Sequence, residues 1–382
     1  MMNHMERTED ESFIAALEAT LGRSIPENRF VIEDATNVMY NSRREVVGLS
    51  LHDCGLEAIP EQVFLLKSLK ILCLVDNHIT SIPDSIELLE SLQKLDLWKN
   101  QLQSLPDSIG NLKKLKKLYL NGNEKTGDEE IIQGNAITSL PETFGDLESL
   151  ELLQLANNKL VTVPDSFGNL THLQSLSLQN NVLESLPETF GQLESLQVLE
   201  LGRNKLGKLP ASFGNLHAID QLLLQNNQLR NLPESFWNLH VKELQLQGNK
   251  LESLPAGLLN LVDLKILNVS NNFLASLPEP LSELVSLKIL DVSGNALVTV
   301  PMLPKSIQRV ELPKNRITSL PEDLKDLAEL KHIEVLGNPL EPGSKEIMAA
   351  LKDNGIDTGL FFAVLKKPEE NPFGQEDSEK DS

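Results

Sequence analysis

One segment of the sequence has the glycine and lysine spacing of a phosphate-binding loop. Gly202-Arg-Asn-Lys-Leu-Gly207-Lys208 matches the start of the pattern G-x-x-x-x-G-K-[ST], in which backbone N–H groups hold phosphates and the last residue binds magnesium. Leu209 follows the lysine here, so the magnesium ligand is missing. Asn204, Leu206 and Leu209 also recur in a repeat described below. We therefore interpret the segment as part of that repeat.

The histidines and cysteines form no recognisable metal or catalytic pattern. The seven histidines are scattered, and none has the spacing of a zinc site. His52 and Asp53 are adjacent, but the sequence shows no nucleophile for such a pair to activate, and we interpret both as solvated residues. The only cysteines, Cys54 and Cys73, lie inside the repeats. We therefore predict no enzymatic activity, no metal site and no cofactor.

A repeat of 23 residues accounts for most of the chain. The run Leu173-x-x-Leu176-x-Leu178-x-x-Asn181 recurs with the same spacing from Leu196 to Asn204. We count thirteen units over residues 46–340, with an insertion at 124–135 and one shorter unit between Asn295 and Asn315. The last position of the motif forms a column of Cys54, Asn77, Asn100, Asn123, Asn135, Asn158, Asn181, Asn204, Asn227, Asn249, Asn272, Asn295, Asn315 and Asn338.

The spacing within each unit predicts its local structure. Alternate residues of L-x-x-L-x-L point the same way, which is the period of a strand. The asparagine follows the strand, where its amide can pair with backbone groups of the turn that no sheet partner reaches. Pro187 fixes the next turn, Phe190 points inward and Gly191 allows a tight bend. One strand per unit would stack into a parallel sheet.

These units resemble the 23-residue leucine-rich repeats of the Ras-group class. That class includes plant intracellular Ras-group proteins, Scribble- and Erbin-type polarity proteins and the repeat regions of bacterial Roco proteins. The resemblance implies an α/β solenoid, a leucine-rich-repeat horseshoe with a concave parallel β-sheet and a convex side of 3-10 or irregular turns and short helices. It also implies protein binding, usually on the concave face. We expect neither the GTPase of Roco proteins nor the PDZ domains of Scribble-type proteins in these 382 residues.

Residues 1–45 are expected to form a helical N-terminal cap, because a solenoid exposes apolar faces at both ends. Thr8-Glu9-Asp10-Glu11 has the form of a capping box. A helix would follow with Phe13, Ile14, Leu17 and Leu21 on one face, ending at Gly22. Residues 30–32 could add an irregular strand.

Residues 341–365 are expected to form a C-terminal cap. Ser344 is placed to cap a helix that carries Ile347, Met348 and Leu351 and ends at Gly355. Phe361, Phe362, Val364 and Leu365 would fold back over the last repeat. Residues 366–382 are polar and acidic, and we predict a disordered tail.

A candidate binding surface follows from the register of the strands. The chain has two Trp and two Tyr, and Trp98 and Tyr119 fall on neighbouring concave strands. Aromatic residues with flexible basic neighbours are typical of interface hot spots, although Trp98 could also simply cover the sheet. The predicted partner-binding residues are Lys94, Asp96, Trp98, Lys99, Lys116, Lys117 and Tyr119. From Lys94 to Lys125, seven lysines against three acidic residues give a local charge of +4 in a chain of net charge −21.

The acidic composition limits the classes of partner. A net charge of −21 disfavours general binding to nucleic acid or anionic membranes. No apolar run has the ~20 residues of a membrane helix, so we expect no membrane insertion. The two cysteines predict a reducing, cytoplasmic location without disulfide-bonded caps. We expect a monomeric, non-catalytic signalling scaffold that binds an acidic and partly apolar segment of a protein. The alternatives are a regulatory or targeting module for an enzyme in trans, such as a small GTPase, and a bacterial effector.

Overall fold

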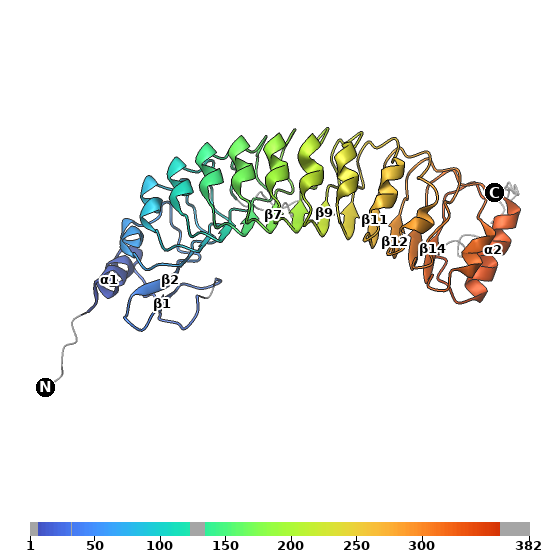
Figure 1. Cartoon of the computed structure of the whole chain (residues 1–382). Coiled ribbons are helices and arrows are strands. Elements are labelled where there is room, and N and C mark those ends of the chain that lie inside the picture. Colours follow the sequence, from blue (N-terminus) through green and yellow to red (C-terminus); the bar gives the residue numbers. More distant parts are fainter. Residues whose placement is uncertain (1–6, 32, 123–133, 360–382) are drawn as a thin grey trace, which may run out of the picture.

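The repeats build one open sheet along the inner side of an arc, and the helices α1 (Glu9–Leu21) and α2 (Pro342–Asp353) lie at opposite ends of that arc (Figure 1). The computed structural model describes residues 7–31, 33–122 and 134–359. Within them, β2 to β14 pair in parallel in chain order, and β1 pairs with β2 antiparallel. The strands are β1 (Asn37–Tyr40), β2 (Val46–Ser50), β3 (Ile71–Cys73), β4 (Lys94–Asp96), β5 (Lys117–Tyr119), β6 (Leu152–Gln154), β7 (Ser175–Ser177), β8 (Val198–Glu200), β9 (Gln221–Leu223), β10 (Glu243–Gln245), β11 (Ile266–Asn268), β12 (Ile289–Asp291), β13 (Arg309–Glu311) and β14 (His332–Glu334).

The strand register follows the repeat and confirms the predicted solenoid. Leu95 of β4 pairs with Leu118 of β5, and the residues on either side of each leucine also pair in register. Both leucines are fully buried. Because side chains alternate along a strand, the flanking residues of each strand face the concave side.

Most convex segments are 3-10 helices that begin directly after a proline. They are η1 (Glu61–Leu65), η2 (Asp84–Leu88), η3 (Asp107–Asn111), η4 (Glu142–Asp146), η5 (Asp165–Asn169), η6 (Glu188–Gln192), η7 (Ala211–Asn215), η8 (Glu234–Asn238), η9 (Ala256–Asn260), η10 (Leu281–Glu283) and η11 (Glu322–Asp326). Phenylalanines from η4 to η8 stack in a ladder with ring centroids 6.0 to 6.2 Å apart. The tight spacing requires glycine beside the ladder, because a Cβ at Gly191 would lie 2.3 Å from the carbonyl oxygen of Ser212.

The shorter unit leaves a groove on the convex side. The segment between η10 and η11 forms turns at Pro304 in place of a 3-10 helix. A cavity of about 690 Å³ occupies this place, lined in part by Val285, Met302 and Leu327.

Among the helices in the described part of the chain, none is long and apolar enough to cross a membrane.

The asparagine column resolves how the repeat continues past the insertion. Asn135 is buried, and its side chain donates to the carbonyl oxygens of Leu97 and Leu120. Asn135 therefore takes the column position of the fourth unit, although the sequence also assigned it to the insertion as its last residue. Asn123 and most of the insertion lie outside the described residues.

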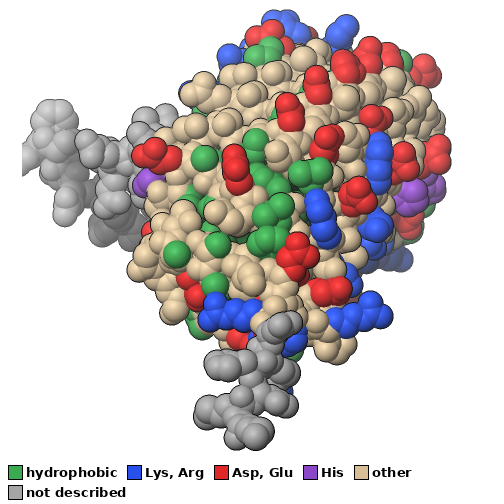
Figure 2. Space-filling view, turned by 90° about the vertical axis from the view of Figure 1, so that its left-hand side faces the viewer, with side chains coloured by type: hydrophobic (Ala, Val, Ile, Leu, Met, Phe, Trp, Pro, Cys, Tyr) green, Lys and Arg blue, Asp and Glu red, His purple; other side chains and the backbone are tan. Residues whose placement is uncertain are grey.

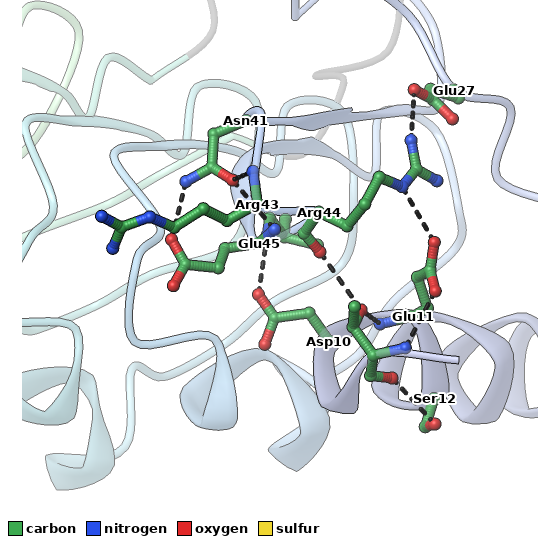
Figure 3. Close-up of polar contacts among 10 residues, drawn as sticks. Asp10, Glu11, Ser12, Glu27, Asn41, Arg43, Arg44 and Glu45 are labelled. Carbon is green, nitrogen blue, oxygen red and sulfur yellow. Dashed lines mark hydrogen bonds and ion pairs between the residues drawn. The ribbon is translucent and has the colours of Figure 1, made fainter. Parts of the chain in front are cut away.

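The predicted capping box forms at the start of α1 (Glu9–Leu21), and the helix ends at Gly22 in the left-handed region. Arg44, in the turn between β1 and β2, ties this helix to the sheet (Figure 3). Its guanidinium pairs with Glu11 and Glu27 at 2.9 and 2.8 Å, and it lies 4.1 Å from the ring centroid of Tyr40. The helix therefore covers the first repeat through both apolar and charged contacts.

The prediction of a strand at residues 30–32 is wrong for Phe30 and Val31, which lie in no strand. The cap strand is β1, further along the chain, and the ring of Phe30 is exposed. Ile32 lies outside the described residues. β1 forms because it pairs antiparallel with β2, and the local hydrophobic pattern does not reveal this pairing.

Figure 2, which looks at the N-terminal end, shows hydrophobic side chains near the centre of this face with acidic and basic ones around them.

At the other end, α2 (Pro342–Asp353) buries Ile347, Met348 and Leu351 as expected. Ser344 is not its N-cap. The N-cap is Glu341. Ser344 lies in the first turn of the helix, and its hydroxyl oxygen accepts the backbone N–H of Leu320 at 3.0 Å. The serine that the sequence predicted as a cap therefore bonds this helix to the repeat that carries β13. The segment from Phe361 to Leu365 and the acidic tail lie outside the described residues.

Candidate functional site

Trp98 is held rigidly by its backbone while its ring stays accessible. It stands in the turn after β4, where its N–H donates to Oδ1 of Asp96 at 3.2 Å and its carbonyl oxygen accepts the N–H of Asp76 at 3.1 Å. The side chain is 42% exposed. The ammonium of Lys99 lies 4.9 Å from the ring centroid. Trp98 therefore offers an accessible aromatic ring on a fixed backbone, with a cation against the ring.

Tyr119 lies on the neighbouring strand, directly opposite Asp96. The ammonium of Lys94 reaches from β4 to within 4.8 Å of the Tyr119 ring centroid, a distance at which a cation is attracted to an aromatic face. Partial burial raises the pKa of the Tyr119 hydroxyl, while Lys94 acts in the opposite direction. The tyrosine is therefore a neutral hydroxyl that can donate a hydrogen bond.

Asp96 is the buried acidic residue of this group. Only 5% of the residue is exposed, and burial raises the pKa of its carboxyl to about 6. The N–H of Trp98 and the charge of Lys94 both work against this rise, and Glu33 adds to it. Asp96 thus supports the turn that carries Trp98 and does not present its charge to a partner.

A loop of the N-terminal cap covers the concave face beside these residues. The thiol of Cys73 donates to the carbonyl oxygen of Glu33 at 3.6 Å, and a Cβ at Gly48 would lie 2.4 Å from the Val31 side chain. Cys73 lies beneath this loop and is buried. Burial raises the pKa of its thiol to about 11, which keeps the thiol protonated near neutral pH. The open concave surface therefore begins at β4.

Acidic side chains accompany the predicted lysines. Glu33 pairs with Lys94, Asp76 with Lys99 at 3.5 Å, and Glu151 with Lys116 at 2.6 Å. The charge count along the sequence missed these three acids. Two of them could have been found, because Asp76 and Glu151 occupy the positions of Lys99 and Lys116 in adjacent repeats. Glu33 comes from the cap, and no sequence pattern places it there.

The structure brings five of the seven predicted residues together: Lys94, Asp96, Trp98, Lys99 and Tyr119. Lys117 is exposed and pairs in register with Lys94. Lys116 precedes β5, whereas Trp98 follows β4, so Lys116 lies toward the other end of the strands. The close group is called the β4–β5 surface below. It offers two aromatic rings, each with a lysine against it, which suits binding rather than bond-making chemistry.

Family models and solved structures agree with this architecture. A leucine-rich repeat region matches residues 45–131, and a second leucine-rich repeat model matches residues 131–183, 184–229 and 239–297. No curated protein matches the chain.

Among solved structures, a leucine-rich-repeat protein of Leptospira interrogans is 28% identical, with a TM-score of 0.57, over 81% of this chain and 95% of that one. The plant peptide hormone receptor RGFR1, in complex with RGF2, is 26% identical, with a TM-score of 0.50, over 79% of this chain and 64% of the receptor. The leucine-rich repeat domain of APL1B shares the fold at 22% identity, with a TM-score of 0.66, over 90% of each chain. Leucine-rich repeats generally serve as protein-interaction modules. Together, the matched repeats and the solenoid show that the chain belongs to the leucine-rich-repeat proteins.

Proposed function

We propose that this protein is a non-catalytic binding module that holds a protein partner on the concave β4–β5 surface. The observation that carries the proposal is the accessible ring of Trp98 on a backbone fixed at both its N–H and its carbonyl oxygen. Rigid aromatic anchors lose little conformational entropy on binding, and they dominate interface energetics. We also propose a reducing, cytoplasmic location, and the two unpaired cysteines support it.

The partner is proposed to carry an acidic and partly apolar segment. An apolar side chain would cover Trp98, and carboxylates would approach Lys99 and Lys117, while Lys94, with a side chain only 16% exposed, supports the Tyr119 ring. The pair of Lys99 with Asp76 does not prevent this, because both side chains are partly exposed and exposed ion pairs contribute only about 0–1 kcal/mol. An incoming carboxylate would therefore exchange with Asp76 at small cost. Binding of RGF2 by a plant peptide hormone receptor of similar architecture supports a peptide-like segment as the ligand.

Affinity capture with the full chain, followed by mass spectrometry, would identify the partner. The affinity of that partner should then be compared for the wild-type protein, Trp98→Ala and Tyr119→Ala. Gln225→Ala is a matched control, because Gln225 occupies the Trp98 position of a later repeat and its carbonyl oxygen likewise accepts an N–H, from Arg203.

We expect Trp98→Ala to weaken binding by about 2 kcal/mol or more and the association rate to fall with added salt. Unchanged affinity in both aromatic variants, together with a loss in Gln225→Ala, would move the site to the middle of the arc and contradict the proposal.

A further inference from the structure

A second cluster of polar side chains lies on β13 and β14, at the far end of the concave face from the β4–β5 surface. Glu311 stands directly opposite Glu334 in the pairing of these strands, and His332 lies on the same face as Glu334, two residues before it. Nε2 of His332 is 3.0 Å from Oε1 of Glu311. One donor atom from each of the three residues can be chosen so that all lie within 4.8 Å of one another. Three potential ligands therefore converge.

Asp357 orients the imidazole of His332 from the other side. Its Oδ2 is 2.8 Å from Nδ1 of His332, and its Oδ1 accepts the N–H of Gly359 at 3.0 Å. The backbone of Asp357 is fixed as well, because its carbonyl oxygen accepts the N–H of Ile333 at 2.9 Å. A carboxylate on one imidazole nitrogen favours the tautomer whose other nitrogen presents a lone pair, as in histidines that bind metals. Nε2 of His332 is thus directed at Glu311 as a ligand atom.

Nε2 of His332 and Oε1 of Glu311 face each other, but no hydrogen bond joins them. Nε2 of His332 and Oε1 of Glu311 are enclosed by protein, and neither makes a hydrogen bond of good geometry. Their side chains are only 15% and 14% exposed. The guanidinium of Arg309, whose side chain is half exposed, is 2.7 Å from the same oxygen of Glu311. Two lone pairs at 3.0 Å repel, and a cation in contact with both atoms would remove this repulsion.

The charge of the cluster also favours a cation. The carboxylates of Glu311, Glu334 and Asp357 outnumber the single guanidinium of Arg309. Like charges directly opposite on neighbouring strands destabilise the pairing. In the described part of the chain, ion pairs reach Glu311 and Asp357 but not Glu334. A divalent ion would offset the excess charge.

We propose that Glu311, His332 and Glu334 bind a divalent ion of the zinc type, with Asp357 as the positioning residue for His332. One imidazole nitrogen and two carboxylate oxygens are donors that Zn²⁺ accepts, at about 2.0–2.2 Å. Two donors 3.0 Å apart at such distances would meet the ion at an angle of roughly 95°. Water would complete the coordination. The site is independent of the β4–β5 surface.

The test is a zinc chloride titration of the full chain by isothermal calorimetry after treatment with a chelator. We expect one tight site per chain in the wild type. His332→Gln should weaken it by more than the ~10- to 100-fold that loss of an outer-shell partner costs, and Asp357→Asn should weaken it within that range. Arg309→Gln should tighten it, because a neighbouring positive charge is removed. His240→Gln is the matched control, since its Nδ1 is 3.6 Å from a single exposed carboxylate of Asp263.

Melting curves with and without zinc provide the second measurement. Zinc should raise the melting midpoint of the wild type and of His240→Gln, because a ligand that binds only the folded state stabilises it. If His332→Gln fails to fold, Glu334→Gln takes its place as the ligand-removal variant. Equal zinc affinity in the wild type and in the ligand-removal variant would overturn the proposal, as would a wild-type chain that binds no zinc.

Discussion

The side chain of Asn181 joins its repeat to the preceding one through the carbonyl oxygen of Leu155. Its Nδ2 donates to that oxygen at 2.9 Å and to the carbonyl oxygen of Leu178 at 3.0 Å. Its Oδ1 accepts the N–H of Leu160, also at 3.0 Å. These hydrogen bonds therefore cross the interface between repeats. The sequence predicted only hydrogen bonds to the turn within one repeat. The stability of the solenoid depends on such interfaces, because each repeat contacts only its neighbours.

We predict that Asn181→Ala lowers the free energy of unfolding by about 1–3 kcal/mol, because buried backbone groups lose their partner. Gln179→Ala is the control. Gln179 is partly exposed two residues earlier, and such a change should stay within about 0.5 kcal/mol. Denaturant unfolding of both variants checks the prediction, and equal shifts of the two midpoints would show that the column has no special role.

The close packing of the convex helices gives a second prediction. A Cβ at Gly168 would lie 2.3 Å from the carbonyl oxygen of Thr189 in the next repeat, and backbone cannot move away easily. Gly168→Ala should therefore destabilise the protein by about 1–3 kcal/mol, the usual cost of overpacking. At Gly207 a Cβ would meet no atom within 4 Å, so Gly207→Ala should be neutral or slightly stabilising. Thermal unfolding of the pair measures the difference, and a similar loss in both would contradict the contact.

The N-terminal cap should be required for a soluble array. Ile14 and Leu17 of α1 are buried, and Asp10 accepts the N–H of Val46 at 2.6 Å at the start of β2. Deleting residues 1–45 removes these contacts and exposes the apolar face of the first repeat, so we expect aggregation or fraying. Light scattering and thermal unfolding report both. A monomeric deletion variant with an unchanged melting midpoint would show that the cap is dispensable.

The sequence predicts contacts that recur from repeat to repeat. It does not predict contacts between segments that occur only once in the chain. Because the repeat fixes the register, it predicted Lys94, Trp98 and Tyr119 as neighbours on adjacent strands. It could not predict that Glu33 reaches Lys94, because that contact depends on the path of a non-repetitive cap loop. The same limit applies to Asp357, which follows the last repeat and meets His332 only through tertiary packing.

Asp96 supplies a stability effect that depends on pH. Burial raises the pKa of its carboxyl from 3.8 to about 6 in the folded protein. Between these values the folded state binds more protons than the unfolded state, so the free energy of unfolding falls as pH rises from about 4 to 6. Above pH 6 the buried carboxylate costs stability, and below pH 4 this cost is absent.

We therefore predict that Asp96→Asn stabilises the protein at pH 7 by about 1–3 kcal/mol, since each pKa unit corresponds to ~1.4 kcal/mol. The amide oxygen can still accept the N–H of Trp98. The gain should shrink toward zero at pH 4, where the wild-type carboxyl is protonated. Denaturant unfolding at both pH values measures it, with Asp291→Asn as the control. Asp291 accepts the N–H of Ser293 at 2.9 Å in the same way but is less buried, so its replacement should have a smaller effect. A gain in Asp96→Asn that is equal at both pH values would mean that desolvation of the carboxylate is not its cause.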